Sequence, residues 1–237
     1  MISIIVPLYN EEKTITNLLL QLSRLAGAHE ILLADGGSTD RTRELAQEML
    51  SQEMLSQASL SKARLLGAPR GRAAQSNAAA REAAGEILFF LHADSQIQPD
   101  TLGHIEKAVS EGATWGCLTL RFDEEHPLTA LCAYFSNLRV RLARIAFGDQ
   151  GIFIRRDAFL KESGFPELPL MEDYEFSLRL RRRRIFPVQL PCPIVTSARR
   201  FREHGRLRTL FLMWRLRRLY RKGCDIQLIA ARYRQVR

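Results

Sequence analysis

Short apolar runs alternate with helical patterns through the first half of the sequence, and this alternation constrains the fold more than any other feature. The runs that predict strands are SIIVPL at 3–8, EILLAD at 30–35, a segment within 60–69, and ILFFL at 87–91. Strands joined through helices and short turns predict an α/β fold with a mainly parallel central sheet and helices on both faces.

The segments between these strands carry helix signals. Asn10 is expected to cap a helix whose apolar stripe runs from Ile15 to Leu25, and Gly85 to end a helix over 73–84. Two further helices are predicted at 40–57 and 99–111. Within the first of these, EMLSQ occurs twice in tandem, at 48–52 and 53–57. Five residues turn a helix by about 500°, so the copy does not extend one apolar stripe and indicates a local duplication.

The second half of the chain is less regular. The elements expected there are a strand at 114–122, a helix at 127–147, a strand at 151–154, a helix from Glu172, an extended segment at 186–196 and a basic helix at 206–222. Because no Gly/Ser-rich linker separates the two halves, we expect one continuous domain that carries this basic C-terminal helix.

Charge is distributed unevenly along the chain. Residues 1–118 have a net charge of −4, whereas residues 119–237 have a net charge of +13. A tail this basic predicts an anionic partner, which can be a nucleic acid, an acidic membrane surface or a phosphorylated substrate. The alternative is a solvated basic face without a partner.

The cysteines and the apolar segments bear on the compartment. Cys117, Cys132, Cys192 and Cys224 lie far apart and form no C-x-x-C pair, which favours a reducing cytoplasm over a disulfide framework. The N-terminal apolar run is too short for a signal sequence, and no apolar stretch approaches the roughly 20 residues that cross a bilayer. We expect a cytoplasmic protein, with peripheral contact at the inner membrane face as a further expectation.

Polar side chains follow three of the predicted strands where each strand ends. Glu11 follows the first strand, Asp35 ends the second, and His92 and Asp94 follow the fourth. Sheets of this kind bind ligands at the carboxyl ends of their strands. A carboxylate in such a place can hold Mg²⁺ or Mn²⁺ together with substrate phosphates, and imidazole is acceptable to Mn²⁺. The alternative for this H-x-D pattern is a purely structural one.

Two further segments carry candidate chemistry. RGRAAQSN at 70–77 places arginines just before a helix, which suits phosphate oxygens, although a basic turn would look the same. Glu172 and Asp173 precede a basic helix, where they either complement the helix dipole or supply a general base.

The ordered set of motifs resembles a known family. N-E-E at 10–12, A-D-G-G-S-T-D at 34–40, G-R-x-x-Q-x-N at 71–77, F-L-H-A-D at 90–94 and E-D at 172–173 are similar to the inverting family-2 glycosyltransferases of the GT-A fold. H-A-D, G-D-Q-G at 148–151, M-E-D-Y-E-F and T-S-A-R-R-F-R-E-H-G look closer to the bacterial radical-SAM/selenodomain-associated transferases.

The resemblance implies roles for individual residues. A nucleotide-sugar donor would contact Pro7, Tyr9, Glu11, Asp35, Arg72 and Asn77. A divalent cation, Mn²⁺ or Mg²⁺, would bind Asp94, with His92 beside it and His204 as a third candidate ligand. Asp173 would accept the proton of the acceptor hydroxyl, with Glu172 as its competitor. Residues 1–205 would form the catalytic domain, in which 1–118 bind the nucleotide and 119–205 the acceptor, and 206–237 the tail.

The sequence departs from the family pattern at two positions. Gly36 stands where a second aspartate is common, and His92 stands where the first aspartate of D-x-D is common. Two other interpretations therefore stay open: a related nucleotidyltransferase, and a non-catalytic protein that binds an anionic surface or nucleic acid. No nucleic-acid motif is present, so no nucleic-acid partner is expected.

The basic helix at 206–222 suggests where an acceptor resides. Leu207, Leu210, Phe211 and Trp214 share one helical face, and arginines become more frequent toward the end. Such a helix lies at an anionic membrane surface or packs on the catalytic domain. The first alternative would suit a lipid or lipid-linked acceptor.

Overall fold

The computed structural model describes residues 1–51 and 62–234. Its first half alternates as predicted, with elements β1 (Ile2–Leu8), α1 (Ile15–Leu22), β2 (His29–Asp35), α2 (Thr42–Ser51), β3 (Ala63–Gly67), α3 (Arg72–Glu82), β4 (Ile87–Phe90), β5 (Gln96–Ile97) and α4 (Thr101–Ser110). The second half holds β6 (Trp115–Phe122), α5 (Pro127–Ala143), η3 (Gly148–Gln150), β7 (Ile152–Arg155), α6 (Arg156–Lys161), α7 (Glu172–Arg182), β8 (Val188–Thr196), α8 (Arg199–His204), α9 (Arg206–Arg221) and α10 (Ile226–Arg234).

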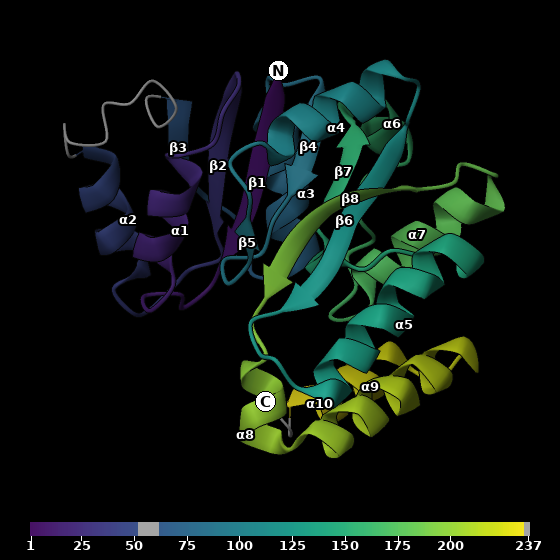
Figure 1. Ribbon diagram of the computed structural model, residues 1–237. Coiled ribbons are helices and arrows are strands. Elements are labelled where there is room, and N and C mark those ends of the chain that lie inside the picture. The colour runs from purple at the N-terminus through teal and green to yellow at the C-terminus, as the bar shows by residue number, and fades with distance from the viewer. Residues whose placement is uncertain (52–61, 235–237) are drawn as a thin grey trace.

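The strands form one curled sheet, which the described residues build in the order β3-β2-β1-β4-β7-β6-β8-β5 (Figure 1). The first four strands in this order are parallel, as predicted, and β6 pairs with β8 in parallel. β7 is antiparallel to both β4 and β6, which the sequence did not predict. Leu8 pairs with Asp35 and Asp35 with Gly67, so the carboxyl ends of β1, β2 and β3 lie at one level.

The core has a layer on each face of the sheet. Ile4 and Val6 of β1 point into the layer that contains α1 and α4, whereas Ile5 points into the layer that contains α3, α6 and α7. This alternation follows from the two-residue period of a strand. The α3 residues in the second layer are alanines, whose small side chains let this helix lie close to the sheet. The predicted helices on both faces are confirmed.

Two predicted helix ends differ from the structure. Asn10 is not the cap of α1, because the helix begins later, after Thr14. Asn10 instead adopts a φ of 54°, and its side-chain Oδ1 accepts a hydrogen bond from Thr39 N at 2.9 Å. Gly85 does not stop α3 in a left-handed conformation, because the chain has already turned extended at Ala83. Its lack of a side chain serves close packing, since a Cβ there would lie 2.5 Å from Ser3 Oγ.

Other boundaries are shorter than predicted. α2 is described as far as Ser51, and the tandem EMLSQ copy at 53–57 lies outside the described residues. α5 ends at Ala143 rather than at 147, because Arg144 adopts the left-handed conformation and the following GDQ forms the separate turn η3. This early end of α5 frees residues 148–150 to turn toward the carboxyl end of β4.

Three helices close the described chain (Figure 1). The basic helix predicted at 206–222 is present as α9, whereas α8 and α10 were not predicted. Leu216 of α9 and Ile229 of α10 pack with Met171 and Tyr174 of the α7 segment in a third apolar cluster. One side of the basic tail therefore packs on the domain. None of the described helices is both long and apolar enough to cross a membrane.

Candidate active site

Gln75 joins the carboxyl ends of the neighbouring strands β1 and β2. Its Nε2 donates to the carbonyl oxygens of Leu8 at 2.6 Å and Ala34 at 2.8 Å. Its side chain also fills the space beside Gly36, where a Cβ would lie 2.9 Å from Gln75 Cδ. The departure from the family pattern at Gly36 therefore has a local reason: the Gln75 amide occupies the place of a side chain. This glutamine belongs to the motif G-R-x-x-Q-x-N, but the motif alone does not predict its role.

Asp35 is fully buried at the end of β2 and organises the loop that follows. Its carboxylate accepts from Gly37 N at 3.1 Å and Ser38 N at 3.2 Å, and it pairs with Arg43 at 2.9 Å. Burial raises the pKa of Asp35, but the hydrogen bonds from Ser38, Arg43 and Gly37 outweigh burial and leave this pKa below its ordinary value. The carboxylate is thus held ionised at the rim.

The loop after β1 lies beside this rim. Pro7 pairs with Ala34 within the sheet, and the ring of Tyr9 stacks under the guanidinium of Arg70, whose Cζ lies 4.1 Å from the ring centroid. Glu11 accepts from Thr14 Oγ1 at 2.7 Å. The half-buried tyrosine and an exposed arginine thus stand together at the carboxyl end of the sheet, where a flat base and its phosphates can bind.

The first residues of α3 and α7 meet across the site. Arg72 Nε lies 2.8 Å from Glu172 Oε1, and the Arg72 side chain remains 41% exposed, whereas Glu172 is buried. Burial raises the pKa of Glu172, and the adjacent guanidinium offsets this only in part. Since the pair joins residues a hundred positions apart in the sequence, spacing could not have revealed it.

Asp173, Gly148 and His92 converge beside this ion pair. The Gly148 N–H donates to Asp173 Oδ2 at 2.7 Å, and the Tyr174 N–H donates to Asp173 Oδ1 at 2.7 Å. A Cβ on Gly148 would lie 3.0 Å from His92 Nε2 and 3.3 Å from Asp173 Oδ2. A side chain at this position would therefore press on both the imidazole and the carboxylate and displace them by a few tenths of an ångström.

His92 is a neutral side chain in this environment. Burial, followed by the positive charges of Arg72 and Arg200, lowers its pKa to about 3. A neutral imidazole keeps one ring nitrogen free of a proton, so it can accept a hydrogen bond or bind a metal. The positive charges of Arg72 and Arg200 disfavour a protonated imidazole and so keep His92 neutral.

Asp149, within the motif G-D-Q-G, is a further acid of this site that the sequence did not predict. Burial raises its pKa, against the opposing charge of Arg139. The buried Oδ1 of Asp149 has no hydrogen-bond partner among the described residues, 1–51 and 62–234. A buried oxygen without a partner is costly, so this atom is a candidate contact for a bound ligand.

The three expected metal ligands are not brought together. Asp94 is exposed after β4, and within the described parts of the chain no three histidine, cysteine or acidic side chains form a metal-binding group. Asp94, His92 and His204 therefore do not form a preformed three-ligand site, and their roles as metal ligands stay a prediction. An exposed carboxylate with a neutral imidazole two residues away still fits a cation whose other ligands are substrate phosphates.

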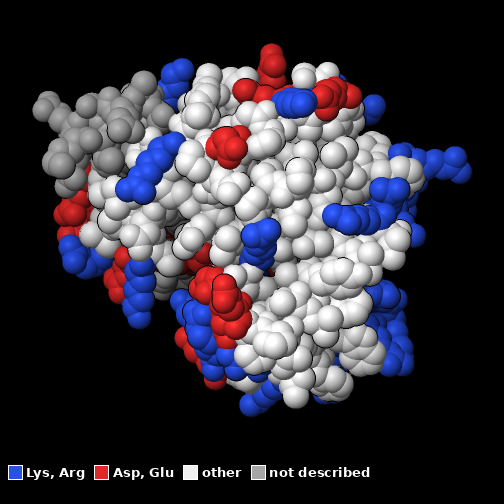
Figure 2. Space-filling view, viewed as in Figure 1, with Lys and Arg blue, Asp and Glu red and all other residues white. Residues whose placement is uncertain are grey.

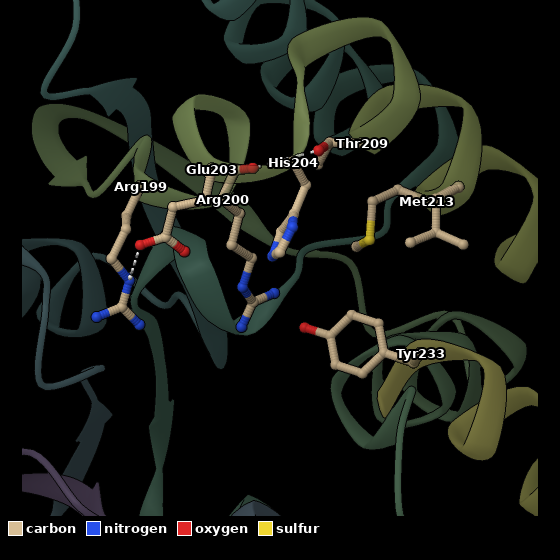
Figure 3. Close-up of a pocket in the computed structure, with 8 residues that line it drawn as sticks. Arg199, Arg200, Glu203, His204, Thr209, Met213 and Tyr233 are labelled. Atoms are coloured by element: carbon tan, nitrogen blue, oxygen red, sulfur yellow. Dashed lines mark hydrogen bonds and ion pairs between the residues drawn. The ribbon is translucent and has the colours of Figure 1, made fainter. Parts of the chain in front are cut away.

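His204 lies instead in a small cavity between α8, α9 and α10 (Figure 3). The guanidinium of Arg200 and the hydroxyl of Tyr233 face one another there, and Arg200 Cζ lies 5.3 Å from the tyrosine ring centroid. Arg200 also acts electrostatically on His92, as does Arg72. The unpredicted helix α8 thus adds a second cation to the site.

Asn77 takes a structural position. Its Nδ2 donates to Phe165 O at 2.8 Å, and its Oδ1 accepts from Phe165 N at 2.9 Å. Both ends of this buried amide are occupied, so the side chain ties α3 to the loop before α7. The sequence predicted that Asn77 contacts the nucleotide-sugar donor, whereas in the structure its amide is engaged by the backbone of Phe165.

Comparisons with known proteins agree with this arrangement. A family model described as Glycosyl transferase family 2 matches residues 3–164. No curated protein matches the chain. Residues 1–349 of TarS from S. aureus, in complex with UDP-GlcNAc, form a similar solved structure with 18% identity and a TM-score of 0.64, covering 83% of this chain and 58% of that chain.

A second similar structure is the mannosyltransferase PcManGT from Pyrobaculum calidifontis in complex with GDP-Man and Mn²⁺. It is 22% identical with a TM-score of 0.67, and the match covers 92% of this chain and 60% of that chain. Identities this low show a shared fold, and the chain spans about six tenths of the length of these two proteins. The predicted GT-A fold is confirmed.

Proposed function

The chain belongs to glycosyl transferase family 2, and from this membership we propose that it moves a sugar from a nucleotide-diphosphate donor to an acceptor hydroxyl with inversion. The observation that carries the proposal is the convergence of Asp173, Gly148 and His92 at the carboxyl end of β4. Similar structures hold UDP-GlcNAc or GDP-Man, which supports a donor of this class. Membership in the radical-SAM/selenodomain-associated subgroup, which shared motifs suggest, stays a prediction.

Asp173 is the proposed general base. A base must present a free lone pair to the reacting hydroxyl, and Asp173 uses only one hydrogen bond on each carboxylate oxygen. Glu172 is a weaker candidate, because it is buried and its Oε1 is paired with Arg72. In our proposal Glu172 positions the arginine, and Asp173 takes the proton while the acceptor oxygen attacks the anomeric carbon from the side opposite the leaving nucleoside diphosphate.

Cations around the site would bind the donor diphosphate. Arg72 is exposed enough to reach a ligand while Glu172 orients it, and Arg200 approaches from α8. Guanidinium groups fixed before the reaction stabilise the charge that develops on the departing diphosphate. At the nucleotide end, Pro7, Tyr9 and Glu11 line the β1 loop, and Asp35 holds the neighbouring loop in shape.

A divalent cation, Mn²⁺ or Mg²⁺, is proposed at Asp94, with His92 as the neighbouring ligand candidate. The fit rests on one exposed carboxylate, so donor phosphates would complete the coordination. When bound, such a cation supplies positive charge that stabilises the diphosphate. The similar mannosyltransferase structure contains Mn²⁺, which supports this choice.

We further propose that the protein acts at the cytoplasmic face of an anionic membrane, on a lipid or lipid-linked acceptor. Leu207, Phe211 and Trp214 of α9 are 68%, 60% and 48% exposed, and Tyr134 and Phe135 of α5 are also exposed. Figure 2 shows that the surface over α5 and α9 in this view is largely uncharged, with lysine and arginine side chains near its margins and a cluster of acidic side chains at the left margin. Aromatic side chains and flanking arginines are the pattern of an interfacial surface.

The test of the enzymatic proposal is a thermal-shift screen of nucleoside diphosphates, nucleotide sugars and nucleoside triphosphates, with and without Mn²⁺. A bound donor stabilises the fold by mass action, so at least one nucleotide sugar should raise the Tm. The Asp94→Ala variant should lose the part of this Tm increase that depends on Mn²⁺. Glu86→Ala is the matched control, because Glu86 is an exposed acid at the opposite end of β4.

The outcomes separate the alternatives. If the chain responds only to nucleoside triphosphates, the nucleotidyltransferase alternative is correct. If no nucleotide shifts the Tm, the chain is not a nucleotide-sugar enzyme and the non-catalytic binder remains. An Asp94→Ala variant that keeps the full Mn²⁺ effect would remove Asp94 from the cation site.

A further inference from the structure

A second, larger hollow lies on the side of the molecule formed by α5, α7, α9 and α10. This hollow, which we call the arginine groove, has a volume of about 790 Å³. Its charged lining consists of Arg139, Arg181, Arg182, Arg217, Arg221 and Glu175. No residue expected from the sequence to bind donor or metal lines it.

The positive charge of the groove is poorly compensated. Glu175, the acid of the lining, is already engaged by Arg182 at 2.9 Å and by the hydroxyl of Tyr220 at 2.8 Å. In the described parts of the chain, no ion pair joins Arg139, Arg217 or Arg221 to a carboxylate, and Asp149 is an acid whose charge acts on both Arg139 and Arg217. Five arginines thus face two acids, and the half-buried Arg217 has no ion pair among the described residues, so this excess of positive charge favours binding of an anion.

Two of these arginines are held against one aromatic ring. Arg139 Cζ lies 3.8 Å and Arg217 Cζ 5.8 Å from the ring centroid of Phe147. Arg139 is anchored further by Gln150 Oε1 at 2.9 Å, and Arg217 by Met213 O at 3.2 Å. Burial and the charge of Arg221 lower the pKa of Arg217, which reflects this crowding of like charges. The cations are thus positioned in advance and need not reorganise to bind an anion.

The rest of the lining is apolar or aromatic. Leu168, Leu178, Ile226 and the rings of Tyr174 and Tyr220 contribute to the walls. A small inorganic anion would leave this part of the groove in contact with water. A ligand with an apolar body attached to an anionic group would use both parts.

The groove adjoins the proposed base. Tyr174 lines the groove and follows Asp173 directly in the sequence, and its backbone N–H donates to that carboxylate. The guanidinium groups of Arg139 and Arg217 stack on the ring of Phe147, which precedes Gly148 in the sequence. The Gly148 N–H donates to the other carboxylate oxygen of Asp173. A ligand in the groove would therefore lie against the same two backbone segments that orient Asp173.

From this geometry we propose that the arginine groove binds the acceptor, and that the acceptor carries a phosphate group on an apolar body. This inference rests on the proposed glycosyl transfer, because it assigns the substrate class of that reaction. The phosphate contacts Arg217 and Arg221, with Arg139 at the inner end, and the apolar body lies along the tyrosine and leucine walls. The attacking hydroxyl belongs to the same molecule.

Isothermal titration calorimetry with hexyl phosphate, inorganic phosphate and hexanol tests this proposal. Wild-type protein should bind hexyl phosphate more tightly than inorganic phosphate and should not bind hexanol measurably. Arg217→Gln and Arg221→Gln should each weaken hexyl phosphate binding about tenfold, because each removes a charge-assisted hydrogen bond. Arg215→Gln is the matched control, since Arg215 is exposed on α9 and does not line the groove.

Each contrary result has a definite meaning. Equal affinity of the control and the two groove variants, or no binding of hexyl phosphate by the wild type, would overturn the proposal. Equal affinity for inorganic and hexyl phosphate would overturn its apolar part. Arg221 is exposed, so its variant keeps the test valid if Arg217→Gln does not fold.

The nucleotide screen keeps this result separate from the enzymatic proposal. Both groove variants should retain the nucleotide-induced Tm increase of the wild type, because their arginines lie outside the donor site. Nucleotide binding without hexyl phosphate binding contradicts the groove alone. If hexyl phosphate binds but no nucleotide raises the Tm, the glycosyltransferase proposal is contradicted. The groove then binds a phosphate compound for a function other than glycosyl transfer.

Discussion

The backbone N–H of Gly148 donates a hydrogen bond to Asp173 Oδ2 at 2.7 Å. This contact joins the turn η3 to the first turn of α7 and fixes the direction of the carboxylate. The His92 ring lies on the other side of the same glycine. The catalytic geometry that we propose therefore depends on a backbone group and on the absence of a side chain.

Replacing the two acids of α7 should separate their roles. Asp173→Asn should reduce kcat by about 10²- to 10⁴-fold while donor binding is retained, because only proton transfer is lost. Glu172→Gln should retain measurable turnover but bind the donor more weakly, because Arg72 loses the partner that orients it. Steady-state kinetics with donor titration measures both effects. The reverse pattern would assign the base to Glu172.

Gly148→Ala should impair catalysis without unfolding the protein. The added Cβ would lie 3.0 Å from His92 Nε2 and 3.3 Å from Asp173 Oδ2, so both side chains must shift. The shift needed is a few tenths of an ångström, so the loss in rate should stay below the roughly 10²-fold that a 1 Å misplacement can cost. Gly103→Ala on α4 is the control, since its Cβ meets nothing within 4 Å. Full activity of Gly148→Ala would show that this contact does not position the base.

Gln75→Ala should destabilise the fold and loosen the donor site. The change removes the hydrogen bonds from Gln75 to the carbonyls of Leu8 and Ala34, each worth about 0.5–1.5 kcal/mol, although Leu8 O still accepts from Gly36 N at 2.9 Å. Urea denaturation measures the loss in the free energy of unfolding. Gln47→Ala, at an exposed position of α2, should change it little. Equal stability of the two variants would mean that water replaces the amide.

Stability in acid should depend on Asp35. Its pKa is lowered in the folded state, so its ionised form contributes stability that is complete above the ordinary pKa of about 4. That contribution is lost as the pH falls through the lowered pKa. Asp35→Asn should therefore be less stable than the wild type at pH 7, and the difference should shrink toward pH 2. Parallel curves in a pH series of urea denaturation would contradict this assignment.

The exposed face of α9 should bind anionic vesicles. Phe211→Ser combined with Trp214→Ser should reduce co-sedimentation with vesicles that contain an acidic phospholipid, because two large side chains no longer enter the interface. High salt should weaken wild-type binding, since the flanking arginines are screened. Phe186→Ser is the control, as Phe186 is exposed outside α5 and α9. Absence of wild-type binding at low salt would end the membrane proposal.

Elements with a strong local pattern could be predicted from the sequence. The strands at β1, β2 and β4 are continuous apolar runs, and the α9 pattern is a long periodic one, so neighbouring residues alone specify them. The helices α8 and α10 were missed because both are short and α8 is basic, so that their stability comes from contacts with α9 and α7 rather than from their own pattern. The cap assigned to Asn10 failed for a related reason: Thr39, 29 positions later, holds its side chain.

The sequence by itself determined the fold class, the family and the candidate acids, because these depend on residue types and on their order along the chain. Only the tertiary structure decided how these residues combine. It paired Arg72 with Glu172, set Gly148 between His92 and Asp173, and placed His204 in the cavity between α8, α9 and α10. It also gathered arginines from three helices into one groove. Contacts of this kind join residues far apart in the sequence, where local propensity and periodicity carry no information.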